Sequence, residues 1–182
     1  MSNPTIASRF DEIYRDTIKA VAAYVTAKCK HTADIGDILQ ETYMELYVVL
    51  QKRGAKYITN EKALVFRLAK QRLARYYSAL EREANIVSLD TAGGENDDDF
   101  HVLSDSIQTE EFVVGQILVD TAEKWIQSKP EDTKKVFYLY YKMGLSIPQI
   151  AEALSLGESN VKNKLYRTLK EMRVLLDGKE NV

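Results

Sequence analysis

The stretch that most restricts how this chain can fold is residues 146–167, SIPQIAEALSLGESNVKNKLYR. Its first apolar positions follow the i, i+3, i+4, i+7 spacing of a helix face: Ile147, Ile150, Ala151 and Leu154. Ser146 and Gln149 have the spacing of a capping box, and Pro148 falls in the first turn, where its missing N–H is tolerated. The pattern breaks at residues 155–157, where Gly157 can cap a second helix. The stretch therefore predicts two short helices joined by a tight turn.

The second helix of this pair has a polar outer face. Its expected buried positions are Val161, Leu165, Leu169, Met172 and Leu176. Its other faces present side chains that bind base edges and phosphates: Ser159, Asn160, Lys162, Asn163, Lys164 and Arg167. This arrangement is typical of a helix-turn-helix DNA reader. An ordinary helical hairpin with a solvated basic face fits the same periodicity, so the rest of the chain has to separate the two interpretations.

Composition limits the classes to which the protein can belong. With 182 residues, the chain can hold one domain or two small ones, and its net charge of −2 excludes a uniformly basic nucleic-acid coat. Eight glycines, three prolines and few alternating β-branched segments predict an all-α fold. The single cysteine, Cys29, excludes an internal disulfide and suits a reducing cytoplasm. The polar N-terminus contains no run suited to a signal peptide or a membrane span. We therefore expect a cytoplasmic protein without membrane insertion.

A helix expected over residues 32–53 has two distinct stripes. One is apolar and should face the core: Ile35, Ile38, Leu39, Thr42, Leu46, Val49 and Leu50. The other begins polar and becomes apolar: Asp37, Gln40, Glu41, Met44, Tyr47 and Val48. Apolar side chains away from the core indicate a surface that binds a partner. A neighbouring helix that covers the second stripe would explain the pattern equally well.

The segment that follows is strongly basic. Between Lys52 and Arg82 there are nine Lys and Arg residues but only two acidic ones. A helix expected over residues 60–83 places Arg67, Lys70, Gln71 and Arg75 on one face, after a turn that contains Lys56 and Tyr57. Aromatic residues interleaved with cations favour single-stranded DNA, whose bases stack while its phosphates are neutralised. A solvated charged face over a tyrosine-rich core remains the alternative.

The composition then reverses. Residues 83–111 carry nine acidic side chains and no Lys or Arg. With Gly93 and Gly94 inside it, this stretch is typical of a flexible linker. We therefore expect a helical domain at residues 1–84, an acidic linker at 85–110 and a helix-turn-helix domain at 111–182.

Motifs of catalysis are missing from the sequence. It contains no phosphate loop, HExxH, paired cysteines or GxSxG, and the Asp97–Asp99 run lacks the spacing of a calcium loop. We expect a binding protein rather than an enzyme, with no metal and no cofactor.

Three stretches together resemble bacterial sigma factors of the sigma-70 family, extracytoplasmic-function (ECF) type. DIGDILQETYMELY resembles the helix that binds the polymerase clamp, ALVFRLAKQRLARYYS the helix that opens the −10 element, and residues 135–176 the helix-turn-helix that reads the −35 element. The resemblance implies a protein that binds core RNA polymerase and directs promoter-specific transcription initiation. The implied partners are the β′ clamp, the β flap, promoter DNA and a possible anti-sigma factor.

The resemblance also implies a role for each group of residues. Polymerase binding would fall to Asp37, Gln40, Glu41, Met44 and Tyr47. Recognition of the −10 element would fall to Lys56, Tyr57, Arg67, Lys70, Gln71 and Arg75. Recognition of the −35 element would fall to Ser159, Asn160, Lys162, Asn163, Lys164 and Arg167.

The chain departs from the family pattern at four positions. The family usually has Trp near Leu64, Asn at Gln71 and Asp at Arg75, and Gly where this chain has Ser155. Arg75 in place of an acid favours a phosphate contact over internal pairing. Two other functions fit parts of the sequence: a dimeric stand-alone helix-turn-helix regulator, and a sigma-like decoy that binds an anti-sigma protein. The first leaves the stripe at residues 37–48 without a role, and the basic recognition helix counts against the second.

Overall fold

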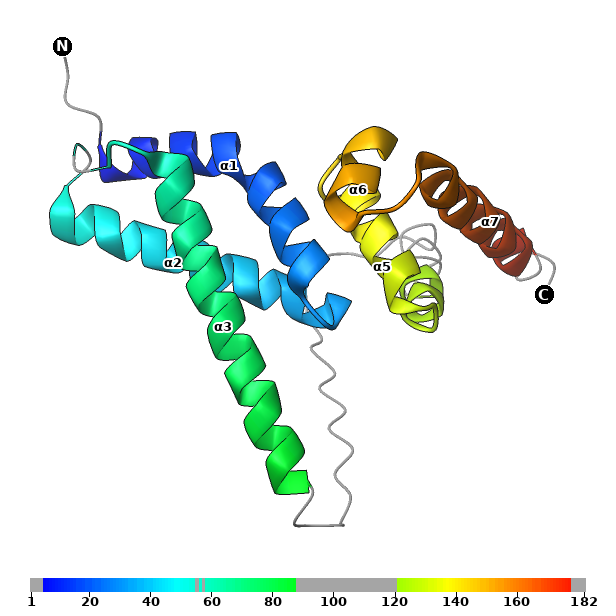
Figure 1. The fold of residues 1–182 in the computed structure, drawn as a ribbon. Helices are drawn as coiled ribbons and strands as arrows, with labels where there is room; N and C mark the ends of the chain where they lie inside the picture. The colour runs from blue at the N-terminus through cyan, green and yellow to red at the C-terminus, as the bar shows by residue number, and fades with distance from the viewer. Residues whose placement is uncertain (1–4, 55, 57, 88–120, 178–182) are drawn as a thin grey trace, which may run out of the picture.

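The computed structural model describes residues 5–54, 56, 58–87 and 121–177 (Figure 1). These ranges are helical and contain no strand, so the all-α prediction is confirmed. The helices form two groups, one on each side of residues 88–120, and each group has an apolar core of its own. The prediction of two small helical domains is therefore confirmed as well.

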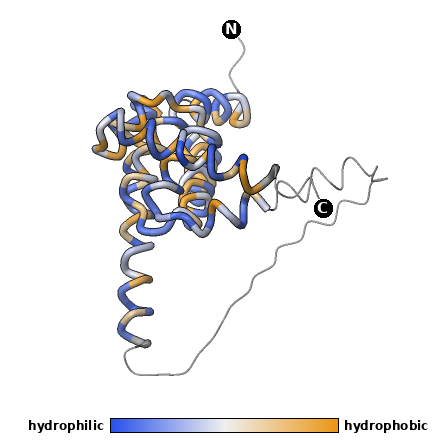
Figure 2. The backbone as a smooth tube through the Cα atoms, turned by 90° about the vertical axis from the view of Figure 1, so that its right-hand side faces the viewer, coloured by the Kyte–Doolittle hydropathy of each residue, from blue (hydrophilic) through white to orange (hydrophobic). Residues whose placement is uncertain are grey.

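The first group consists of α1 (Ile6–Lys28), the short 3₁₀ helix η1 (Thr32–Asp34), α2 (Ile35–Arg53) and α3 (Glu61–Val87). The three long helices pack against one another around fully buried aliphatic side chains, among them Val21, Val25, Leu46, Leu50 and Val65. Val21 and Val25 on α1 are four residues apart, and so are Leu46 and Leu50 on α2, which places one stripe of each of these helices in the core. Beyond the core, the C-terminal turns of α3 project away from the other helices (Figures 1 and 2).

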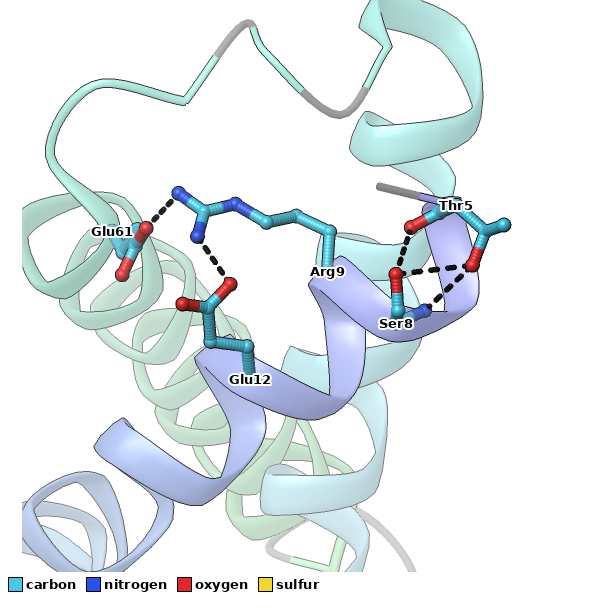
Figure 3. Close-up of polar contacts among 5 residues, drawn as sticks. All are labelled: Thr5, Ser8, Arg9, Glu12 and Glu61. Atoms are coloured by element: carbon cyan, nitrogen blue, oxygen red, sulfur yellow. Dashed lines mark hydrogen bonds and ion pairs between the residues drawn. The ribbon is translucent and has the colours of Figure 1, made fainter. Parts of the chain in front are cut away.

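Polar side chains fix the start of α1 against the start of α3 (Figure 3). Thr5 caps α1, because its hydroxyl accepts a hydrogen bond from the backbone N–H of Ser8 at 3.1 Å. Arg9, one turn later, forms ion pairs with Glu12 on its own helix and with Glu61 in the first turn of α3. The N-terminal ends of the two helices are thereby held together.

The second group consists of a helical segment at residues 121–127, α5 (Glu131–Phe137), the π-helical segment η2 (Tyr138–Lys142), α6 (Ile147–Leu154) and α7 (Glu158–Asp177). Its core includes the fully buried Val136, Leu139, Ile150 and Val161. α5 begins after Pro130. Before it, the Ser128 hydroxyl donates a hydrogen bond to the carbonyl of Trp125 at 2.6 Å.

The turn between α6 and α7 has the geometry of a helix-turn-helix. At its start, the backbone N–H of Ser146 donates to Gln149 Oε1 at 2.9 Å, which confirms that half of the predicted capping box. At the end of α6, Ser155 is in the left-handed region with φ 55° and ψ 41°. The N–H of Leu156 reaches the carbonyl of Ala151 at 2.9 Å, which completes a Schellman motif. Glycine is the usual residue at this position, so Ser155 adopts a conformation that disfavours it.

The boundary expected at residue 84 falls inside a helix, since α3 continues to Val87. Residues 88–110 of the expected linker lie outside the described residues, and so do 111–120 of the expected second domain. No helix in the part of the chain that the structure describes is both long and apolar enough to cross a membrane.

Candidate nucleic-acid and partner interfaces

The second stripe of α2 is exposed. Asp37, Gln40 and Glu41 are open to solvent, and Met44, with 61% of its surface accessible, continues the stripe towards Tyr47 and Val48. The alternative that a neighbouring helix covers this stripe does not hold for the described residues. Tyr43, between the two stripes, is buried and hydrogen-bonds to Thr17 in the core.

A groove of about 640 Å³ runs beside this stripe, between α1 and α2. Gln40, Met44 and Tyr47 line one side of it, and Phe10 and Tyr14 line the other. Tyr14 is 40% accessible although it lies one turn from Phe10 on the same side of α1. The four-residue spacing of Phe10 and Tyr14 was the available signal for this aromatic wall. The groove is suited to an apolar surface of a partner with a polar edge near Asp37.

Glu41 differs from the other residues of the stripe because it already has a partner inside the protein. Arg72 of α3 donates to Glu41 at 3.0 Å and to Glu45 at 2.6 Å. The charge of this arginine is thereby used inside the first domain. Glu41 positions α2 against α3 and still keeps an accessible carboxylate.

The basic face of α3 forms as expected from the sequence. Arg67, Lys70, Gln71 and Arg75 follow helical spacing and are all exposed. Among the described residues, none of the three cations on this face forms an ion pair, which leaves their charge available to phosphates. Lys56 is exposed in the turn before the helix, while Tyr57 lies outside the described residues.

A smaller pocket of about 430 Å³ lies where this turn meets α3. Ile58, Thr59, Asn60, Leu64 and Arg67 are among the residues that line it. Asn60 caps the helix, because its Oδ1 accepts from the backbone N–H of Ala63 at 3.0 Å. The pocket therefore lies at the capped start of α3, beside the cationic side chain of Arg67.

The outer face of α7 carries the third predicted set. Ser159, Asn160, Lys162, Asn163 and Arg167 are exposed, and Lys164 is half-buried. Two of the cations have acidic neighbours one turn along the helix. Lys162 lies 3.9 Å from Glu158, and Arg167 lies 3.0 Å from Glu171, which also pairs with Lys129. These hydrogen bonds from Lys129 and Arg167 lower the pKa of Glu171.

The structure keeps the three predicted sets on three separate helices. None of them meets a second set to form a catalytic cluster, and no group of three or more metal-binding side chains occurs among the described residues.

The family model for sigma-70 region 4 matches residues 130–172, which span α5 to α7. The ECF RNA polymerase sigma factor SigM of Bacillus subtilis (strain 168) is 23% identical over 167 residues, covering 91% of this chain and 93% of the relative. A solved structure of the sigma factor RpoE with the anti-sigma factor NepR from Bartonella quintana gives a TM-score of 0.47 at 15% identity, covering 92% of this chain and 96% of that one.

The fold and the match over α5 to α7 define a helix-turn-helix protein whose second domain is a sigma-70 region 4. Along nearly the whole chain, the protein is also similar to an ECF RNA polymerase sigma factor of the sigma-70 family.

Proposed function

We propose that this chain is a sigma factor that binds core RNA polymerase through α2, opens the −10 element with α3 and reads the −35 element with α7. The observation that carries the proposal is the exposed stripe from Asp37 to Val48 beside an apolar groove, on the same chain as a region 4 helix-turn-helix. A stand-alone regulator has no use for that groove, whereas an initiation factor needs a surface for polymerase.

Each assigned surface has the chemistry of its proposed partner. The α2 stripe, with Asp37, Gln40, Glu41, Met44 and Tyr47, would bind the clamp of the β′ subunit. The α3 face, with the preceding turn, would bind the −10 strand through Lys56, Tyr57, Arg67, Lys70, Gln71 and Arg75. α7 would bind −35 DNA through Ser159, Asn160, Lys162, Asn163, Lys164 and Arg167, and its domain would meet the flap of the β subunit. An anti-sigma factor is a further proposed partner.

Two details of the structure support the assignment of DNA-binding residues. Arg75 is exposed and, among the described residues, forms no ion pair, as expected of a phosphate contact. The pocket beside Asn60 and Arg67 is open at the proposed −10 surface and is available to an unstacked base. Extrusion of a base requires such a pocket, because its lost stacking has to be replaced.

Run-off transcription on a library of candidate promoters tests the function directly. Core polymerase with the wild-type chain should yield transcripts from a subset of promoters that share upstream and downstream elements. The variant Met44→Asp should abolish the transcripts, because a charge in the apolar groove opposes docking, and Glu81→Ala on the far end of α3 is the matched control. Transcripts from no promoter, or equal transcripts with Met44→Asp, would contradict the proposal.

A further inference from the structure

The two helical groups are docked onto each other through α5 and α6. α6 packs along α1, and α5 packs beside η1 (Figure 1). Tyr138 and Met143 contact both apolar cores, and Ala23 of α1 packs against the core of the second group. The nearer ends of the two groups therefore share a continuous interface.

Two charged residues of α5, one turn apart, bind the corner where α1 ends and η1 begins. Glu131 Oε2 accepts hydrogen bonds from the backbone N–H of Thr32 at 2.8 Å and from its hydroxyl at 2.6 Å. Lys135 Nζ donates to the carbonyl of Cys29, the residue that caps the C-terminus of α1, at 2.7 Å.

The signs of these charges match the helix ends that they meet. The first N–H groups of a helix have no internal acceptor, and the last carbonyls have no internal donor. η1 receives no capping hydrogen bond from the side chain of His31, and Glu131 supplies one from the other domain. At η1 the N–H and hydroxyl of Thr32 bind the carboxylate directly, and at the C-terminus of the long helix α1 the ammonium is also stabilised by the helix dipole. The spacing of Glu131 and Lys135 thus complements the corner between α1 and η1.

The docked position affects the proposed polymerase surface. Tyr138 and Met143 form one end of the groove that Gln40, Met44 and Tyr47 line. A partner that fills this groove has to contact or displace the second domain. The part of α2 that is proposed to bind polymerase is therefore not independent of region 4.

The docked position also fixes the two DNA-reading faces relative to each other. α3 packs on α1, α1 on α6 and α6 on α7, so the faces of α3 and α7 are coupled through two intervening helices. By their numbering, the −10 and −35 elements lie about 25 base pairs apart, or about 85 Å along straight duplex. A protein that reads both elements has to match that separation, and the docked contacts hold its two faces at a single one.

We propose that Glu131 and Lys135 hold the free protein in a closed state, which core polymerase and promoter DNA have to open. This inference rests on the proposed function. If only the open fraction binds, the apparent affinity for polymerase is reduced by that fraction. Weakening the contacts of α5 should therefore strengthen polymerase binding, which is the opposite of the effect expected from loss of a binding residue.

Förster transfer on the full chain measures the closed state. Dyes are placed at Lys62→Cys on α3 and Lys170→Cys on α7, both exposed, in a Cys29→Ala background. The parent should show high transfer that falls on addition of core polymerase. Glu131→Ala, with or without Lys135→Ala, should lower transfer without polymerase and bind polymerase roughly three- to tenfold more tightly. Asp132→Ala, which removes an exposed acid from the same turn, should match the parent.

Thr32→Val tests the same contact from the first domain, because it removes the hydroxyl donor and leaves α5 intact. It should also lower transfer, and circular dichroism should show helix content equal to that of the parent. The proposal would be overturned if the Glu131 and Thr32 variants both kept the Förster transfer of the parent. It would also be overturned if they opened but did not bind polymerase more tightly. If the parent binds no polymerase, the proposed function fails, and the transfer comparison separately decides whether α5 closes the free protein.

Discussion

Arg72 of α3 donates a hydrogen bond to Glu45 of α2 across the helix interface, with 2.6 Å between guanidinium nitrogen and carboxylate oxygen. The same guanidinium reaches Glu41 at 3.0 Å, and the arginine side chain is only 21% exposed. It therefore connects the proposed polymerase helix to the proposed −10 helix.

Replacing Arg72 should destabilise the first domain. Arg72→Ala leaves two carboxylates of α2 without their cation, and we expect a loss of about 1–2 kcal/mol in the free energy of unfolding by urea. A double-mutant cycle with Glu45→Ala should give a coupling of about 1 kcal/mol. Arg75→Ala, one turn away and exposed, is the control and should change stability by less than about 0.5 kcal/mol. Equal effects of the two arginines would contradict the structural role of Arg72.

Tyr43 should make the fold sensitive to alkali. Burial raises the pKa of its hydroxyl to about 12, while Thr17 lies 3.0 Å away. A raised pKa means that the neutral form is favoured in the folded state. The resulting stabilisation of the folded state is complete below pH 10, which is the usual pKa of a tyrosine hydroxyl. It is lost as the pH rises towards 12. This contributes at most roughly 2–3 kcal/mol. Tyr43→Phe should flatten the decrease in stability between these pH values, measured by urea unfolding, whereas Tyr47→Phe should not.

Replacing Ser155 with glycine should stabilise the protein. Because its φ of 55° lies in the left-handed region, Ser155→Gly relieves the strain of the side chain, and we expect about 0.5–1 kcal/mol of added stability in thermal unfolding. Ser155→Val should lower the free energy of unfolding by more than about 1 kcal/mol, because a β-branched residue is strained more than serine in the left-handed region. A stabilising valine substitution would refute this geometry for the turn.

The proposed −35 surface predicts a salt signature. Replacing Lys162 with Ala should weaken upstream protection in footprints and reduce the slope of log affinity against log salt by about 0.9, as expected for one lost phosphate contact. Asn160→Ala should change the preferred upstream sequence with little change in slope. Lys124→Ala removes an exposed charge from another helix of the same domain and is the control. An unchanged slope with Lys162→Ala would exclude a phosphate contact there.

Truncating polar side chains on the proposed clamp surface should weaken polymerase binding. Asp37→Ala and Gln40→Ala should weaken retention of the chain on immobilised core polymerase by roughly tenfold each, a typical loss for a central interface residue. Both side chains are exposed, so circular dichroism should be unchanged. Full retention of both variants would remove the assignment of α2 to polymerase.

Several features could be predicted from the sequence because they depend on neighbours along the chain. Four-residue spacing of Val21 and Val25, or of Leu46 and Leu50, places both members of each pair on one face of a helix. The exposed stripe at Met44 and Tyr47 followed from the same periodicity. The cap formed by Ser146 and Gln149 depended on two residues three positions apart.

Other features were decided only by contacts between distant segments. Sequence periodicity gave no sign that Arg72 pairs with Glu41 and Glu45, since charge alone does not specify a partner 27 or more positions away. The match of Glu131 to Thr32 joins residues 99 positions apart. Local sequence determines which faces a helix presents, because neighbours along the helix share its geometry. Only the tertiary structure decides which of these faces meet, because that depends on the packing of the whole chain.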